Sequence, residues 1–97
     1  MKKLQIKHET LKLTDDYEGW EFTARVNPPL GVVMDISSGE ISRIVPAMAK
    51  MITAWNFVDE DGTPIECSEE GLKQLPIDLM MKLASAFSEK VGNAEKN

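Results

Sequence analysis

The chain has few residues of the kinds that build covalent cross-links, metal centres or catalytic centres. Its 97 residues include one cysteine, Cys67, and one histidine, His8. One cysteine excludes an intramolecular disulfide and is compatible with a reducing cytoplasm. A zinc site would need both residues together with carboxylates, at none of the usual ligand spacings, and nucleophilic catalysis would need a base beside a serine or the thiol. We therefore expect no metal, no cofactor and no catalytic residue.

Long hydrophobic runs are also missing. No apolar run approaches the roughly 18 residues of a membrane span. The opening Met1-Lys2-Lys3 is not followed by the apolar stretch of a signal peptide. We therefore expect no membrane contact and a protein that stays in the compartment where it is made.

Positive charge is scarcer than negative charge, and the acids are concentrated. The formal net charge is -5, and residues 59–70 contain six acids without an intervening base. This stretch would repel the phosphates of a nucleic acid. The scattered lysines near the N-terminus are typical of a solvated edge strand. The sequence therefore predicts no nucleic-acid partner.

The acidic turn contains part of a calcium-loop pattern. Asp59, Asp61 and Gly62 would be positions 3, 5 and 6 of an EF-hand loop. Position 1 would then be Phe57 and position 12 would be Ser68, so the first ligand and the bidentate glutamate are missing. We expect a solvated turn instead.

Alternating apolar residues predict a β-hairpin in residues 1–26. The alternation covers residues 11–13 and 20–26, which is the period of half-buried strands. Residues 14–19 between them are typical of a loop. The second strand is expected to turn one face to the core, with the residues Trp20, Phe22, Ala24 and Val26.

The segments on either side of this hairpin are less regular. Leu4 and Ile6 are out of phase with the first strand, which predicts a bulge near His8. Pro28-Pro29 ends the second strand, because proline removes ladder donors. Residues 30–36 are apolar but short, and their pattern fits either one turn of helix or a third strand.

A helical part is expected from residue 37 to residue 92. Ser37 and Glu40 have the spacing of a capping box, which predicts a helix start. Pro46 either kinks this helix or is its first residue, in which case the helix begins near Val45. Apolar residues at helical spacing extend the prediction to residue 55: Ile41, Ile44, Val45, Met48, Ile52 and Trp55.

Two more helices are expected after the acidic turn. Ser68 is a suitable N-cap for a short helix over residues 69–74. Pro76 opens the last helix and Gly92-Asn93 closes it. Residues 93–97 are then a frayed tail.

These elements predict one α+β domain, residues 1–97, in which an N-terminal antiparallel β-hairpin packs against about three α-helices. No internal repeat or long linker divides the chain. The expected core consists of Trp20, Phe22, Val26, Ile44, Met48, Ile52, Phe57, Ile77, Met80 and Ala84.

The last predicted helix has an unusually wide apolar arc. The arc covers roughly 200°, against about 100° for a helix with one buried face. Either the helix lies between two elements of its own domain, or part of the arc docks on a partner. Six methionines suit adaptable docking. The partner-binding hypothesis assigns Leu79, Met80, Leu83 and Phe87 to this contact.

Three segments resemble the small tail assembly chaperones of long-tailed bacteriophages and prophages. They are the strand Trp20–Val26, the run Ala54–Pro64, and Leu75–Met80 at the start of the last helix. The resemblance runs from about residue 20 to residue 91, and its most specific part is the middle segment. These motifs are structural and name no active residue.

The resemblance implies a non-enzymatic protein that binds the tape measure protein during tail assembly. Such a protein works in the cytoplasm of the bacterial host and is absent from the mature virion. The tail-tube protein is a further candidate partner, and self-association is left open. The alternatives are a structural virion component, such as a tail-tube or connector subunit, and an unrelated small interaction domain.

Overall fold

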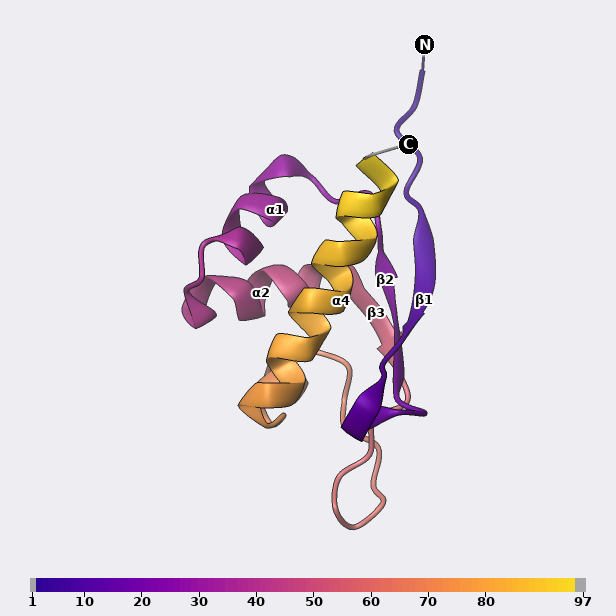
Figure 1. Ribbon diagram of the computed structural model, residues 1–97, viewed down its shortest axis with the longest axis vertical. Helices are drawn as coiled ribbons and strands as arrows, with labels where there is room; N and C mark the ends of the chain where they lie inside the picture. The colour runs from indigo at the N-terminus through magenta and orange to yellow at the C-terminus, as the bar shows by residue number, and fades with distance from the viewer. Residues whose placement is uncertain (1, 96–97) are drawn as a thin grey trace.

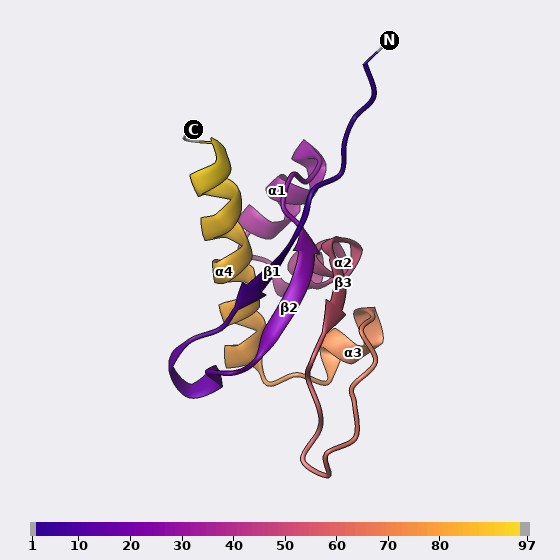
Figure 2. The same ribbon diagram turned by 90° about the vertical axis from the view of Figure 1, so that its right-hand side faces the viewer.

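A three-stranded antiparallel sheet forms one layer of the molecule, and helices pack on it (Figure 1, Figure 2). The computed structural model describes residues 2–95, with side chains for residues 2–92. The predicted α+β class, with an N-terminal hairpin packed against helices, is confirmed. In chain order the elements are β1 (His8–Lys12), the 3₁₀ turn η1 (Asp15–Tyr17), β2 (Glu21–Arg25), α1 (Leu30–Ser37), α2 (Ile41–Met51), β3 (Ile52–Trp55), α3 (Glu69–Lys73) and α4 (Ile77–Glu95).

The predicted β-hairpin consists of β1 and β2, joined by a loop that contains η1. On its exposed face the hydroxyls of Thr10 and Thr23 are hydrogen-bonded at 2.8 Å. The predicted bulge near His8 is wrong. Pairing with β2 is continuous from His8 to Lys12, and the irregularity lies between β2 and β3 instead.

The strand β3 replaces the last part of a predicted helix. Helical spacing of Ile52 and Trp55 predicted a helix as far as residue 55, and that prediction is wrong. The helix α2 stops at Met51, and Ile52 pairs with Ala24 of β2. Ile52 and Trp55 are three residues apart, which fits the apolar stripe of a helix. The edge of β2, however, supplies hydrogen-bond partners for the backbone of residues 52–55, and the segment pairs there as a strand.

Asn56 extends the contact between β2 and β3 with its side chain. Its Oδ1 accepts a hydrogen bond from the Glu21 amide at 2.9 Å, and its Nδ2 donates to the Gly19 carbonyl at 3.0 Å. The Asn56 amide also donates to the Glu21 carbonyl at 3.2 Å. These three bonds tie the end of the hairpin loop and the start of β2 to the chain directly after β3.

Residues 30–36, which fitted a helix or a strand equally, belong to the helix α1. The predicted capping box of Ser37 and Glu40 is wrong, because Ser37 is the last residue of α1. The helix α2 starts directly after Glu40, whose side chain makes no cap hydrogen bond. Gly39 has φ +78, a left-handed conformation that suits glycine and turns the chain between the helices. Pro46 lies inside α2, so the helix begins before it.

The starts of α3 and α4 follow their predicted caps, whereas the end of α4 does not. The Oγ of Ser68 accepts a hydrogen bond from the Gly71 amide at 3.1 Å, as an N-cap does. Directly after Pro76, α4 begins. The predicted helix end at Gly92 is wrong, because α4 continues through residue 95. The last two residues of the predicted frayed tail, 93–97, lie outside the described part.

One hydrophobic core joins the sheet to α1, α2, α3 and α4. Eight of the ten residues predicted for the core are buried. Trp20 is partly buried, and Ile77 is 68% exposed, because it is the first residue of α4 and faces away from the core. The largest fully buried side chains are Phe22, Met48, Phe57, Leu79, Leu83 and Phe87.

A chain of four aromatic rings links the hairpin loop to the segment after β3. The ring centroids of Tyr17 and Trp20 lie 5.3 Å apart, and those of Trp20 and Phe57 lie 5.2 Å apart. Phe57 stacks on Trp55 at 4.7 Å. The indole Nε1 of Trp55 donates to the Ile65 carbonyl at 2.7 Å, which satisfies the one polar group of this ring.

Candidate functional site

The four residues predicted to bind a partner lie in the core. Leu79, Met80, Leu83 and Phe87 are each at most 3% exposed. The helix α4 that carries them runs beside α1 and along the sheet (Figure 1, Figure 2). Most of its wide apolar arc is therefore covered by neighbours within the domain, whereas Ile77 and Met81 remain 68% and 45% exposed. The expectation that these four side chains form an exposed surface is wrong. Met80, Leu79 and Phe87 each line a different surface hollow, although their side chains are almost fully buried.

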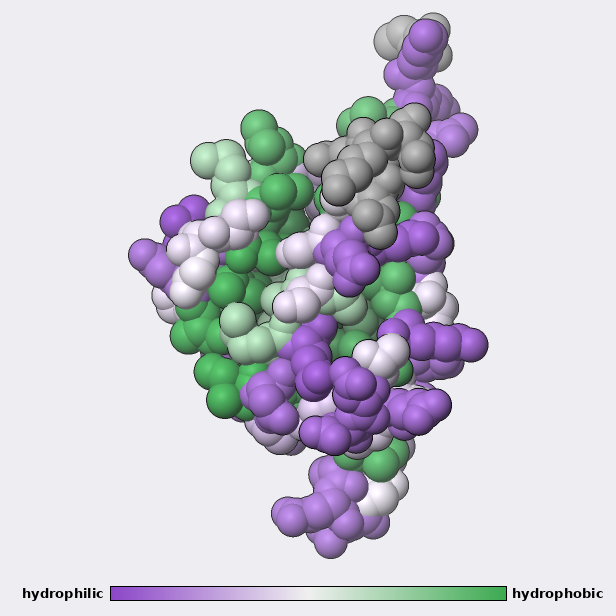
Figure 3. Space-filling view, viewed as in Figure 1, coloured by the Kyte–Doolittle hydropathy of each residue, from purple (hydrophilic) through white to green (hydrophobic). Residues whose placement is uncertain are grey.

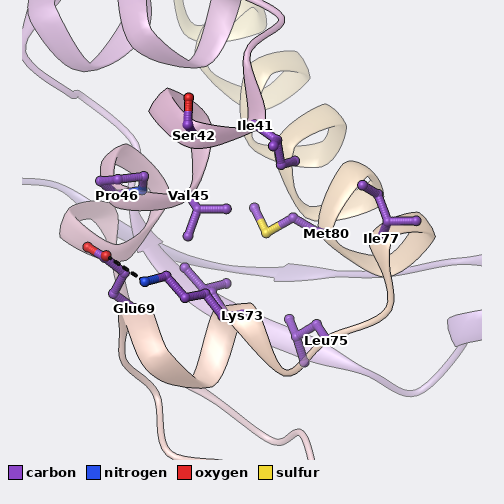
Figure 4. A pocket seen from close by; sticks show the side chains of 10 residues that line it. Ile41, Ser42, Val45, Pro46, Glu69, Lys73, Leu75, Ile77 and Met80 are labelled. Atoms are coloured by element: carbon purple, nitrogen blue, oxygen red, sulfur yellow. Dashed lines mark ion pairs between the residues drawn. The ribbon is translucent and has the colours of Figure 1, made fainter.

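An apolar groove of about 430 Å³ opens where the first turns of α2 and α4 meet α3 (Figure 4). Val45 and Met80 point toward each other across its middle. Ile41 and Ile77 lie on its rim and are 41% and 68% exposed. The residues that line the groove are Ile41, Ser42, Val45, Pro46, Glu69, Leu72, Lys73, Leu75, Ile77 and Met80.

The rim is apolar because two helices begin there with isoleucine. Ile41 is the first residue of α2 and Ile77 is the first residue of α4. A side chain at such a position is not surrounded by a preceding turn of its own helix. Sequence reasoning assigned Ile77 to the core and missed the groove, since three separate segments build it. The available signal for Ile77 was its place directly after Pro76, the expected helix start. No such signal marked Ile41, because its helix was expected to start at Ser37 or near Val45.

Pro46, inside α2, also lines the groove. Proline has no amide hydrogen, so it cannot donate the usual helical bond to the carbonyl four residues earlier. That carbonyl belongs to Ser42, which lines the groove.

One edge of the groove carries a small charged cluster. The Nζ of Lys73 lies 3.4 Å from Glu69 Oε2 and 3.5 Å from Glu70 Oε1 (Figure 4 shows the pair with Glu69). The charge of Glu70, and then the contacts with Glu69, raise the pKa of Lys73 above its ordinary value. These groups are exposed, so each ion pair contributes little stability. One ammonium between two carboxylates leaves this edge negative.

The acidic turn is organised by its own backbone. Asp59 Oδ1 accepts hydrogen bonds from the amides of Asp61 and Thr63, both at 2.9 Å. Gly62 has φ +83, which only glycine adopts without strain. Within the described residues, no group of three or more histidine, cysteine, aspartate or glutamate side chains is placed to hold a metal ion.

Cys67 and His8 lie away from the groove lining. Cys67 is partly buried before α3, and this burial raises the pKa of its thiol. A thiol with a raised pKa is less available as a thiolate nucleophile near neutral pH. His8 is exposed at the start of β1.

The fold and the groove together describe an α+β domain with an exposed apolar groove between helix ends. No helix in residues 2–95 is long and apolar enough to cross a membrane. The chain matches no family model, no curated protein and no solved structure with which it was compared.

Proposed function

We propose that this protein is a tail assembly chaperone of a long-tailed bacteriophage or prophage, and that it holds a helical segment of the tape measure protein in the apolar groove. One observation carries the proposal: the groove exposes apolar area at Ile41 and Ile77, with Val45 and Met80 beneath. On this proposal the protein is not an enzyme. It acts in the host cytoplasm and is absent from the mature virion.

An amphipathic helix is the occupant that suits such a groove. Helix-in-groove recognition uses apolar side chains one helical turn apart, which insert between the helices of the receptor. In the family that the sequence resembles, the tape measure protein is long, helical and prone to aggregate. Exposed apolar stripes of that kind need cover until the tail is built.

Charge supports the same function. The chain has a net charge of -5, and the Glu69–Glu70 edge of the groove is negative. Like charges keep protein molecules apart in solution. A complex whose exterior is largely this chain would therefore stay dispersed while its apolar client is covered.

The test is co-expression with the tape measure protein of the same phage or prophage. We expect the two proteins to co-purify, and Ile77→Asp to weaken the complex. Loss of a buried isoleucine contact is worth roughly 1.5 to 3 kcal/mol, so affinity should fall about tenfold or more. Aspartate in the first turn of α4 is compatible with the helix, so the fold should persist.

Leu30→Asp is the matched control for this substitution. Leu30 is the first residue of α1 and is 73% exposed, but it does not line the groove. It should leave capture unchanged. Failure of the wild-type protein to co-purify with the tape measure protein, or to improve its solubility, would refute the proposed function. Equal losses in both variants would refute the groove as its site.

The rival is a structural virion component whose apolar surface is a permanent subunit interface. The two functions differ in whether the finished particle contains this chain at a fixed ratio to its other proteins. If the protein is a chaperone, mass spectrometry of purified particles should not find it at such a ratio. Detection of this chain at a fixed ratio to the tail-tube protein would favour the rival.

A further inference from the structure

The chain before β1 forms a basic and apolar arm, residues 2–7. Leu4 is 93% exposed and Ile6 is 57% exposed, and both are large apolar side chains two residues apart. Lys2, Lys3 and Lys7 flank them. The arm runs out from the body at one end of the molecule (Figure 1, Figure 2).

The arm has a defined exit from the body. The Lys7 amide donates to Asn27 Oδ1 at 2.9 Å, and the Val26 amide donates to the Lys7 carbonyl at 2.8 Å. The Asn27 side-chain amide also donates to the Gln5 carbonyl. These bonds hold the backbone at Gln5 and Lys7 while leaving Leu4 and Ile6 exposed, so the arm leaves the body at a fixed point with its apolar side chains in solvent.

A hollow at the opposite end of the molecule has complementary chemistry. It measures about 480 Å³ and lies between the acidic turn and the link from α3 to α4. Its charged lining residues are Asp59 and Glu60, and Val58 at its edge is exposed. The residues that line this hollow are Trp20, Val58, Asp59, Glu60, Ile65, Gln74, Leu75, Pro76 and Leu79.

We propose that the arm of one copy of this chain docks in the acidic hollow of a second copy. Leu4 and Ile6 would cover apolar lining, and the lysines would face Asp59 and Glu60. The arm cannot reach the hollow of its own copy. In both views the arm and the acidic turn lie at opposite ends (Figure 1, Figure 2), and the longest dimension of the molecule is 49 Å.

The distribution of charge favours a second copy as the occupant. Figure 3 shows hydrophilic residues at both ends of the molecule, and these have opposite sign: lysines in the arm, and Asp59, Glu60 and Asp61 in the turn. Contact between unlike patches is head to tail, so the same contact can repeat along a row of copies or close into a ring. Because charged groups contribute, the contact should weaken as salt is added.

This contact is separate from the groove proposed for the tape measure protein. The two linings share Leu75 and no other residue. Self-association through the arm therefore leaves the groove of every copy open. A row of copies would present several grooves to one long client, which raises the effective concentration of each groove for the next client segment.

Sedimentation of the full chain at increasing concentration tests the contact. We expect the wild-type mass to rise above the 10.8 kDa of the monomer, and to fall again in high salt. A variant with Leu4→Ser and Ile6→Ser lacks a working arm, and Glu60→Lys lacks a working hollow. Each should remain at the monomer mass when studied separately.

Mixing these two variants gives the decisive result. The arm variant keeps its hollow and the hollow variant keeps its arm, so an equimolar mixture should form one complex of twice the monomer mass and nothing larger. Leu30→Ser, an exposed apolar change outside the arm, should assemble as the wild type does. Circular dichroism checks that every variant is folded.

Four outcomes would overturn the proposal. The wild-type protein could stay monomeric, the arm variant could assemble as the wild type does, or the mixture could form no complex. If Glu60→Lys assembled as the wild type does, the arm would not dock in the acidic hollow. None of these results depends on the tape measure protein, so the proposed function and the self-association succeed or fail separately.

Discussion

Gly71 in α3 has no room for a side chain, and its replacement by alanine should destabilise the protein. A Cβ atom at this position would lie 1.7 Å from the Glu66 carbonyl oxygen, 2.9 Å from the Glu66 carbonyl carbon and 3.1 Å from Trp55 Cζ2. The first two atoms belong to the backbone, so no side-chain rotation relieves the clash. The chain before α3 has to move.

The size of the effect follows from two opposing terms. Overpacking of this kind costs about 3 kcal/mol, at the upper part of its usual range, because the obstacle is backbone. Alanine gains roughly 1 kcal/mol over glycine inside a helix. We expect a net loss of about 2 kcal/mol for Gly71→Ala, which lowers the melting temperature of a domain of this size by roughly 8 to 16 °C.

The measurement is thermal and urea unfolding followed by circular dichroism, with Gly92→Ala as the matched control. Gly92 also lies in a helix, and nothing stands within 4 Å of a Cβ placed there. That variant should gain up to about 1 kcal/mol, since only the helix term remains. A Gly71→Ala protein as stable as the wild type would show that Glu66 does not hold the position described here.

Three further outcomes are expected. Leu83→Glu should unfold the domain, because it buries a charge at a site with 0% exposure. Met81 is exposed on the same helix, so Met81→Glu should change the free energy of unfolding by less than about 0.5 kcal/mol in urea titrations. Tyr17, the one tyrosine, should ionise above pH 10 in an ultraviolet titration, because the hydrogen bond of its hydroxyl to Asp78 raises its pKa, and Asp78→Asn should lower the midpoint. The stability from this bond is present below pH 10 and is lost as the pH rises through the raised pKa of Tyr17. If the free energy of unfolding showed no such decrease at alkaline pH, the contact between Tyr17 and Asp78 would be contradicted. Asn56→Ala removes two side-chain hydrogen bonds and should lower stability by about 1 to 3 kcal/mol in calorimetry. Asn56→Asp should lower stability as well, because its carboxylate can accept from the Glu21 amide but cannot donate to the Gly19 carbonyl.

Local patterns predicted the elements that depend on neighbouring residues. The alternation around Phe22 identified the second strand of the hairpin, and Ser68 identified the start of α3. In both cases the pattern that reveals the element lies within a few residues, although the partners of Phe22 are the more distant Leu11 and Trp55. The predicted helix start at Ser37 was wrong although it also came from a local pattern. Ser37 and Glu40 have the spacing of a capping box, but Ser37 ends α1 and the chain turns at Gly39 before α2 begins.

The candidate site could not be predicted from local sequence patterns. The width of the apolar arc on α4 looks the same in the sequence whether neighbours in the domain or a partner cover it. The burial of Leu83 shows that neighbours cover the middle of the arc, while Ile77 and Met81 stay exposed. Ile52 joined a strand because Ala24 stands opposite it, a relation across 28 residues that no helical period contains. The groove needs the ends of α2 and α4 to meet α3, which is again a property of the assembled fold.

The aromatic chain has an optical consequence. Both tryptophans of the protein belong to it, Trp20 beside Tyr17 and Trp55 stacked on Phe57. Intrinsic fluorescence therefore reports on the hairpin loop and the segment after β3, while far-ultraviolet circular dichroism reports mainly on the helices. If the acidic turn detaches before the helices melt, the emission will shift at a lower urea concentration than the dichroism does. Coincident curves would mean that this segment and the helical layer unfold as one cooperative unit.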